Sequence, residues 1–414
     1  MSTRADLALV GRTVASAAHS GTKICPVTEA DIVCRLLSRN GPSREFFTCE
    51  ARRLAVLCRE MAERFLDGGR LLAFGRGPWA TDAQHIAVEF VHPVIVGKRA
   101  LPALDISSSF EHTLPALVRR RDIVIGFGPP EGDPVVANAI AIARRRGAQT
   151  FALAGGDGDY VAPVLTHDPM MHQELIEVLY HTLWESVHVF FEHRAHGHDI
   201  GASSFLYPFL GHAQQPMEAI VDDIASSIDA KARQDEVLRA RVAAMSVHAI
   251  QSAIMAINHR LDAGGTILVF GNGGSATDAN DFAIDCVTPA GAMPIIPAVS
   301  LASEVASITA IANDIGSDAI FLRQIIAHSR PEDVAVAIST SGGSANIIAA
   351  LAHARTRGLL TVAILGYDGG RIAREHLADI VLVVPSDDIP RIQEVQASIY
   401  HVMIEELRRL RDVR

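Results

Sequence analysis

Two loops rich in glycine and hydroxyl side chains are the clearest candidates for chemistry in this sequence. The first, GNGGS at 271–275, and the second, STSGGSAN at 339–346, each follow a short apolar run. Glycines let the backbone approach an anion closely, while hydroxyls and the free amides at a helix start donate hydrogen bonds to it. The same residues also cap helices and make tight turns, but two such loops favour a phosphate cradle. Neither is a Walker loop or a dinucleotide fingerprint, so we expect no nucleotide cofactor.

The elements around these loops predict a parallel sheet. Apolar, β-rich runs alternate with segments of helical periodicity, and the runs lie at 266–270, 294–299, 333–338, 360–365 and 379–384. Continuous apolar strands are typical of a sheet that is covered on both faces. Five of them indicate an α/β, doubly wound (flavodoxin-like) fold, in which ligands lie beyond the carboxyl ends of the strands. Both loops fall at such ends, and a long closing helix is expected over 391–410.

The chain contains this domain twice. Residues 64–87 and 260–283 are similar and share the sequence Ala-Thr-Asp-Ala, with an offset of 196 residues. Near the end of each half a Gln-Glu pair precedes a Tyr-His pair, now with an offset of 220 residues. So long a period indicates duplication of a whole domain, with a first copy that is shorter in its middle. Its strands are expected at 70–74, 122–126 and 149–153.

These patterns divide the chain into four parts: a lead-in at 1–45, a first domain at 46–195, a linker at 196–215 and a second domain at 216–414. The lead-in is either a short helical segment or partly disordered. The formal charge of −10 disfavours nucleic acid as a partner. No stretch reaches the roughly 20 uncharged apolar residues of a membrane span, and the charged N-terminus is a poor signal peptide. We therefore expect a cytoplasmic protein with no membrane partner.

The combined motifs resemble the sugar isomerase (SIS) domain and, within it, the phosphoheptose isomerases. They are GNGGS, STSGGSAN, an Asn313-Asp314 pair, and RIQE at 391–394 followed by His401. The resemblance covers 216–414 and, more faintly, 46–195. It implies a phosphorylated sugar as substrate, with the following residues contacting the phosphate or the sugar: Asn272, Gly273, Gly274, Ser275, Asp314, Ser339, Thr340, Ser341, Ser344 and Gln393.

The same resemblance implies an aldose–ketose isomerisation through an enediol, assisted by one zinc ion per chain. The first copy matches the four metal positions of the family with His85, Glu89, Gln173 and His181. Glu89 would be the catalytic base and His181 the acid. The second copy has Asp281 and Asp285 at the first two positions, followed by Gln393 and His401. Gln173 and His181 lie roughly 12 Å apart along a helix, so one of them could serve a different site or the neighbouring copy.

The loops of the first copy have the opposite character. They read GRGPW at 75–79 and GFGPPEGD at 126–133, where hydroxyls are missing, prolines remove amide donors, and Glu131 and Asp133 add negative charge. The first copy therefore keeps the predicted metal-binding and catalytic residues, and the second copy keeps the predicted phosphate-binding loops. This division predicts a composite site between the two copies. Because the family forms tetramers of single domains, two such chains would make a homodimer equivalent to a tetramer.

Two other functions compete with the isomerase. A non-catalytic sugar-phosphate regulator or assembly protein would explain the eroded motifs of each copy. An aldolase or an aminotransferring enzyme has no support, because neither motif holds an evident Schiff-base lysine. The isomerase hypothesis requires that His85 and Glu89 lie within reach of the Ser339–Ser344 loop of the second copy.

Overall fold

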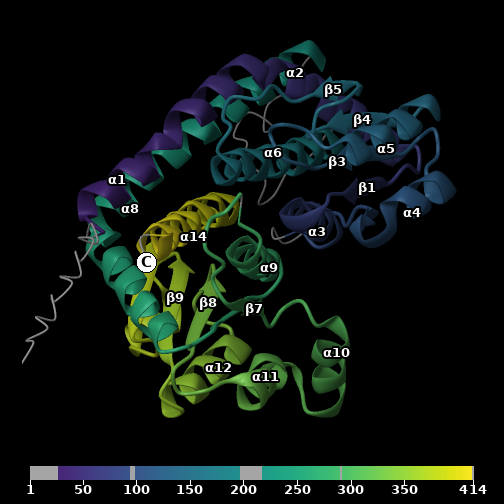
Figure 1. The fold of residues 1–414 in the computed structure, drawn as a ribbon. Helices are drawn as coiled ribbons and strands as arrows, with labels where there is room; N and C mark the ends of the chain where they lie inside the picture. The colour runs from purple at the N-terminus through teal and green to yellow at the C-terminus, as the bar shows by residue number, and fades with distance from the viewer. Residues whose placement is uncertain (1–26, 94–97, 196–216, 290, 413–414) are drawn as a thin grey trace, which may run out of the picture.

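The computed structural model describes residues 27–93, 98–195, 217–289 and 291–412. The predicted linker at 196–215 and residues 1–26 of the lead-in lie outside the described residues. The rest of the lead-in is helical, so the helical alternative holds for residues 29–38 and from residue 40 onward. The chain forms two lobes, each built on one parallel sheet (Figure 1).

Both sheets have five parallel strands in the same spatial order. The first has the order β2-β1-β3-β4-β5 and consists of β1 (Leu71–Phe74), β2 (Ala103–Asp105), β3 (Ile123–Gly126), β4 (Gln149–Ala152) and β5 (Tyr160–Val161). The second has the order β10-β9-β8-β6-β7 and consists of β6 (Ile267–Phe270), β7 (Ala298–Ser300), β8 (Val334–Ser339), β9 (Leu360–Gly366) and β10 (Ile380–Val384). Counted within each copy, both orders are 2-1-3-4-5, the flavodoxin-like arrangement. The predicted fold class is therefore confirmed.

The helices follow the same duplication. The first copy has α3 (Ala80–Val91), α4 (Phe110–Leu117), α5 (Pro134–Arg145) and α6 (Pro169–Ala195), with 3-10 turns at Gly77–Trp79 and Ser107–Ser109. The second copy has α9 (Gly274–Val287), α10 (Val305–Asp314), α11 (Ile320–His328), α12 (Ala345–Thr356), α13 (Gly370–Arg374) and α14 (Ile389–Asp412), with a 3-10 turn at Ser317–Ala319. The additional helix α10 lies between the second and third strands of the second copy, which accounts for much of the difference in length.

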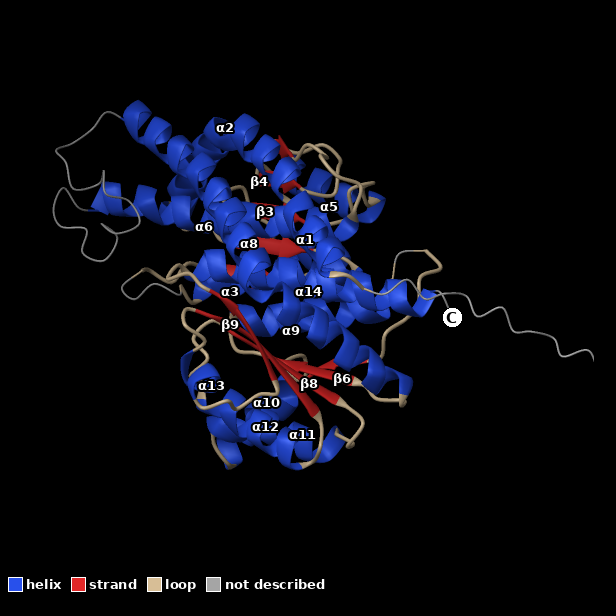
Figure 2. Ribbon diagram, turned by 90° about the vertical axis from the view of Figure 1, so that its left-hand side faces the viewer, coloured by secondary structure: helices blue, strands red, loops and turns tan. Residues whose placement is uncertain are grey.

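Four helices form a layer between the two sheets. The helix after the first strand of each copy (α3 and α9) and the last helix of each copy (α6 and α14) pack against one another there (Figure 2). Because all four are covered on both sides, even their polar side chains are buried. The histidines, carboxylates and glutamines of the two predicted metal motifs lie on these four helices, so the fold brings both copies of the motif into one layer.

Three further helices tie the lobes together: α1 (Glu29–Ser38), α2 (Asn40–Leu66) and α8 (Met217–Asp262). The 46 residues of α8 span about 69 Å at 1.5 Å per residue. Ile224, near its start, packs in the core of the first sheet, and Ile254, near its end, packs in that of the second. Helix α1 precedes the first copy in the sequence, yet its Ile32 packs in the core of the second sheet. Helices α1 and α8 therefore each pack against the sheet of the other copy.

Only α8, among the described helices, is long and apolar enough to cross a membrane by length and composition. Helices that pass through the core of a globular protein meet the same criterion, and both ends of α8 supply core residues. The apolar stretch of α8 is 33% buried, and a single helix of this kind is weak evidence for a membrane span.

Candidate active site

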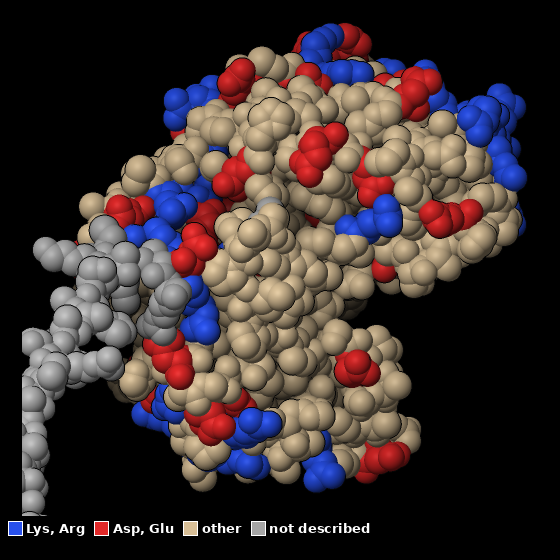
Figure 3. Space-filling model, in the orientation of Figure 1, with Lys and Arg blue, Asp and Glu red and all other residues tan. Residues whose placement is uncertain are grey.

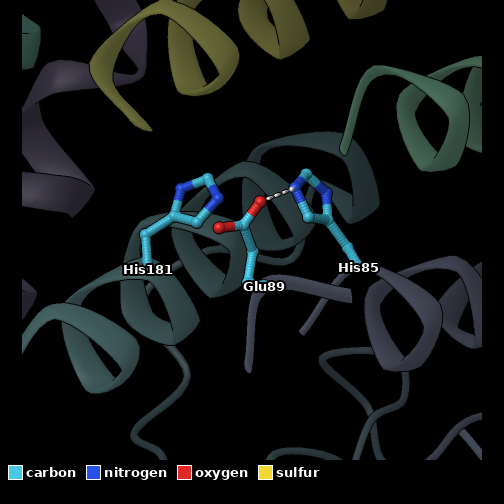
Figure 4. A group of neighbouring side chains, drawn as sticks. All are labelled: His85, Glu89 and His181. Atoms are coloured by element: carbon cyan, nitrogen blue, oxygen red, sulfur yellow. Dashed lines mark ion pairs between the residues drawn. The ribbon is translucent and has the colours of Figure 1, made fainter. Parts of the chain in front are cut away.

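His85, Glu89 and His181 come together in the layer between the sheets (Figure 4). Helix α3 presents His85 and Glu89 one turn apart on the same face, and α6 supplies His181. The possible ligand atoms of the three residues all lie within 4.8 Å of one another. His85 Nε2 is 3.9 Å from Glu89 Oε1. No side chain of the group is more than 3% exposed, so the group is shielded from bulk water.

Several polar atoms around this cluster are buried without a hydrogen-bond partner. They are Glu89 Oε2, His181 Nε2 and Gln393 Oε1. Each such atom costs about 1–3 kcal/mol unless something pairs with it. Imidazole nitrogens, a carboxylate and an amide oxygen are all electron-pair donors, and the first two are ordinary zinc ligands. The residues present therefore fit a divalent metal ion.

The two glutamines are exchanged between the copies, which the sequence analysis did not anticipate. Gln393 of the second copy lies beside the first cluster, with its Nε2 atom 3.4 Å from His85 Nε2. Gln173, predicted as the fourth ligand of that cluster, instead donates to Asp281 Oδ1 at 2.6 Å. The reason is the two-turn spacing between glutamine and histidine on one helix. Helices α6 and α14 pack against each other, so each glutamine reaches the constellation of the other copy.

The histidines are also held by carboxylates from the opposite copy. His181 Nδ1 lies 2.9 Å from Glu394 Oε1, and His401 Nδ1 lies 3.0 Å from Glu174 Oε1. Such a partner orients the ring and leaves Nε2 available to a metal ion. The sequence analysis gave no role to Glu174 or Glu394, although the repeated Gln-Glu pair was the signal that could have found them.

His85 has a partner of the same kind. Its Nδ1 atom is 3.4 Å from Oδ1 of Asp278, which belongs to the Ala-Thr-Asp-Ala sequence shared by the two copies. Asp278 stands at the start of α9, directly behind the phosphate loop of the second copy. Both histidines of the first cluster are therefore positioned by the second copy.

Burial shapes the charge state of the cluster. It raises the pKa of Glu89 to about 8, with a further contribution from Glu185. It lowers the pKa of His181 to about 3, with Arg391 acting in the same direction, and lowers the pKa of His85 well below its usual value. Both imidazoles are therefore neutral at pH 7, which is the form that binds a metal. A bound cation would in turn favour the charged carboxylate of Glu89.

The loop at 271–275 of the second copy, predicted to bind phosphate, contacts the histidine cluster of the first copy. A Cβ atom on Gly274 would lie 2.8 Å from His85 Nε2 and would also overlap the amide of Gln393. Only glycine therefore permits the observed approach of this loop. Gly273, which precedes it, has a φ of 58°, a conformation that glycine adopts readily.

The second loop adjoins the first through a pair of amides. Asn272 and Asn346 exchange two hydrogen bonds of 3.0 and 2.8 Å. The hydroxyl side chains of the predicted cradle line this region at different depths: Ser275 and Ser339 are buried, Thr340 and Ser344 are half-buried, and Ser341 is exposed. The structure thus joins the two predicted loops to each other and, through Gly274, to His85.

Asp314 does not lie in this group. It ends α10, a helix without buried residues, and its carboxylate accepts a hydrogen bond from Asn313. Helix α10 stands at the outer side of the second lobe, away from α3 (Figure 1).

In the first copy, the backbone amides after the corresponding loop at 126–133 are bound by a carboxylate of that loop. Asp133 caps α5 and accepts hydrogen bonds from the backbone amides of Val135 and Val136 at 2.8 and 3.2 Å. Its other oxygen lies 3.2 Å from a guanidinium nitrogen of Arg76. The amides and the cation that could attract a phosphate are therefore already engaged, which supports the predicted division of labour.

Replacing Gly274 by Ala tests the contact between the copies. The added methyl group would push on His85 and Gln393, and we expect a loss of stability of about 1–3 kcal/mol, as for other overpacked sites. Metal affinity should fall as well, because the cluster is displaced. Denaturant unfolding and a metal titration measure the two effects. Gly41→Ala, where nothing lies within 4 Å of the new methyl, is the control, and equal effects of the two changes would contradict the contact.

Comparison with known proteins places the chain in a family. The model of the SIS domain family matches residues 233–366. The phosphoheptose isomerase of Citrifermentans bemidjiense is 44% identical over 165 residues, which cover 39% of this chain and 83% of that protein. The phosphoheptose isomerase of Geobacter sulfurreducens is 41% identical over 190 residues, covering 45% of this chain and 96% of that protein. The chain belongs to the SIS domain family, and it is a tandem member that resembles phosphoheptose isomerases.

Solved structures show the same fold over both copies. A putative tagatose-6-phosphate ketose/aldose isomerase from Clostridium novyi NT is 12% identical, with a TM-score of 0.54, and the match covers 91% of this chain and 89% of that one. The C-terminal domain of glucosamine-fructose-6-phosphate aminotransferase from Francisella tularensis is 8% identical, with a TM-score of 0.56 and coverage of 90% and 96%. At these identities the likeness concerns the fold alone.

Proposed function

We propose that this protein is a metal-dependent isomerase that interconverts a phosphorylated ketose, of the seven-carbon class, and the corresponding aldose. The relatives that are named phosphoheptose isomerases support the reaction class. The observation that carries the proposal is the contact of Gly274, in the phosphate loop of the second copy, with His85 of the first. The 339–346 loop adjoins the 271–275 loop through the hydrogen bonds between Asn272 and Asn346, which supports a composite site.

The phosphate would be held by the second copy. Ser275 and the residues from Ser339 to Ser344 present hydroxyls and backbone amides at two adjacent helix starts, where the helix dipole also favours an anion. Asn272, predicted to contact the sugar, adjoins the second loop through its hydrogen bonds with Asn346. This grip would place C1 and C2 of the substrate at the cluster of the first copy.

The first copy would move the proton. Glu89 Oε1 faces His85, whereas Glu89 Oε2 has no hydrogen-bond partner and is available to take the proton from C1 of the ketose and return it to C2. His181 Nε2, which is likewise unpartnered, would hold the proton at the substrate oxygen of the enediol. A zinc ion held by His85, by the other oxygen of Glu89 and by Gln393 would stabilise the negative charge on the enediolate oxygens. The burial of the cluster excludes water, which strengthens each of these interactions.

The proposal includes a homodimer in the cytoplasm. Helix α10 has no buried residues, and Val305 and Ile315 at its two ends are 68% and 58% exposed. Apolar side chains exposed in this way are suited to a protein contact, and two chains would assemble four SIS domains. Light scattering at micromolar concentration should give the mass of a dimer, and the mass of a monomer would contradict the assembly.

The decisive experiment follows the exchange of a C1 proton of the ketose with solvent deuterium. The wild-type protein would be loaded with zinc and offered five-, six- and seven-carbon ketose phosphates, together with the unphosphorylated sugars. We expect exchange and aldose formation with a phosphorylated sugar only. Binding of a sugar phosphate without exchange on any member of the panel would overturn the isomerase and favour the non-catalytic regulator.

A further inference from the structure

A second cluster of buried side chains occupies the corresponding position in the other copy, and the proposed reaction does not use it. Asp281 and Asp285 lie one turn apart on α9, and His401 comes from α14. Their possible ligand atoms all lie within 4.8 Å of one another. His401 Nε2 is 3.3 Å from Asp281 Oδ2 and 3.2 Å from Asp285 Oδ2. No member of this cluster has a side chain more than 9% exposed.

The side chains of this second cluster are oriented by partners around them. His401 Nδ1 lies 3.0 Å from Glu174, which fixes the ring and directs Nε2 into the cluster. Asp281 accepts hydrogen bonds from Thr81, Gln173 and Tyr400 at 2.8, 2.6 and 2.8 Å. Carboxylate support of the histidine and hydrogen bonds to the carboxylates are the features that surround metal ligands in proteins.

Two atoms at the centre of the cluster form an ion pair without a well-directed hydrogen bond. Asp285 Oδ2 and His401 Nε2 are buried and 3.2 Å apart, yet neither atom meets the geometry of a hydrogen bond. Atoms that both point toward a third position lie close in this way without bonding to each other. The buried guanidinium of Arg408 lies nearby but does not bond to the carboxylate of Asp285, because it donates to the backbone carbonyl of that residue.

The buried negative charge around the second cluster also favours a bound cation. A third buried carboxylate, that of Asp82, lies 3.3 Å from the amide of Gln173, which also binds Asp281. Buried carboxylates are costly unless cations or hydrogen bonds compensate them. One imidazole can offset only one of these charges, whereas a divalent ion would offset two.

The second cluster borders a cleft between the copies. The cleft measures about 480 Å³ and is lined, among others, by Gln173, Asp285, Arg408, Trp79 and Pro129. It lies at the carboxyl ends of the strands of the first copy, where the loops at 75–79 and 126–133 offer no phosphate cradle. An ion held at its wall would be open on one side to a small molecule, but not to a sugar phosphate bound as in the first site.

We propose that Asp281, Asp285 and His401 bind a second divalent cation at the wall of this cleft. Its ligands differ in kind from those of the first site, because two carboxylates and one imidazole replace two imidazoles and one carboxylate. Carboxylate oxygens favour harder ions such as Mn²⁺, whereas imidazoles suit zinc. The second site therefore accepts harder ions such as Mn²⁺ more readily than the first site does. This inference is independent of whether the first site is an isomerase.

Electron paramagnetic resonance of free Mn²⁺ tests the proposal on the full-length, metal-stripped chain. Glu89→Gln removes one charged ligand of the first site, and in this variant we expect about one Mn²⁺ per chain to bind at the second site. Adding Asp285→Asn, which nearly preserves size, should remove that ion. Binding of no Mn²⁺ by the Glu89→Gln variant would overturn the proposal, and so would an equal number of ions in the single and double variants.

A folding control accompanies this comparison. Circular dichroism in metal-free buffer shows whether the double variant remains folded. If it does not, His401→Gln replaces Asp285→Asn in the same Glu89→Gln background. Loss of the ion in this folded variant supports the site, and retention of the ion rejects it.

Discussion

Glu89→Gln is expected to lower the turnover of a ketose phosphate by at least about 100-fold, the usual contribution of a general base. The amide keeps the size and much of the polarity of the carboxylate but cannot accept the proton from C1. Affinity for the sugar phosphate should persist, because the phosphate would be held by the loops of the second copy. Deuterium exchange at C1 measures the chemical step, and calorimetry measures the binding.

The corresponding change in the second copy is the matched comparison. Asp285→Asn should cost much less turnover, because Asp281 stands where the first copy has His85 and because the adjacent loops offer no phosphate cradle. A loss confined to the Asp285 variant would move the chemistry to the second copy. Metal content should be measured in both variants. An unchanged exchange rate in a Glu89→Gln protein that retains its zinc would remove Glu89 from the reaction.

The sequence predicted the sheets where the strands were long enough to carry a pattern. Four strands of the second copy (β6, β8, β9 and β10) were found because each is a continuous apolar run, as expected for strands of a covered sheet, whereas the run at 294–299 only overlaps the three-residue β7. In the first copy, β2 and β5 escaped because they have only three and two residues. The crossing of α1 and α8 between the lobes was also missed. An amphipathic pattern predicts that a helix has a buried face, but not which of two cores covers it.

The residues of the candidate site could likewise be predicted where they depend on local spacing along a helix, but not where they depend on how the helices pack. His85 and Glu89 could be paired because residues four apart share one face of any helix. The exchange of Gln173 and Gln393 depends on how α6 and α14 pack, and no local pattern contains that information. The two-turn spacing between Gln173 and His181 nevertheless indicated that these side chains could lie apart, and Gln173 bonds to Asp281 of the other copy. The role of Gly274 became visible only with His85 beside it.

The phosphate grip can be tested by a single added charge. Ser341 is exposed in the second loop, where its Oγ atom lies 3.3 Å from the amide of Gly343 and accepts its hydrogen bond. In Ser341→Asp the carboxylate would take this amide and repel the phosphate. Two unit charges 4 Å apart interact by about 1 kcal/mol in water and about 4 kcal/mol near a protein surface. We therefore expect affinity for a sugar phosphate to fall by at least about 100-fold in calorimetry.

The control must add the same charge to the first copy without disturbing the fold. Gly128, which aligns with Ser341, is unsuitable because a side chain there would overlap Ala154. Ser108 is exposed in the loop after β2, and Ser108→Asp should leave the affinity nearly unchanged, since the loops of the first copy do not hold the phosphate. Unfolding in denaturant should be the same for both variants, which separates binding from stability. Equal losses of affinity in the two variants would show that the second copy does not hold the phosphate alone.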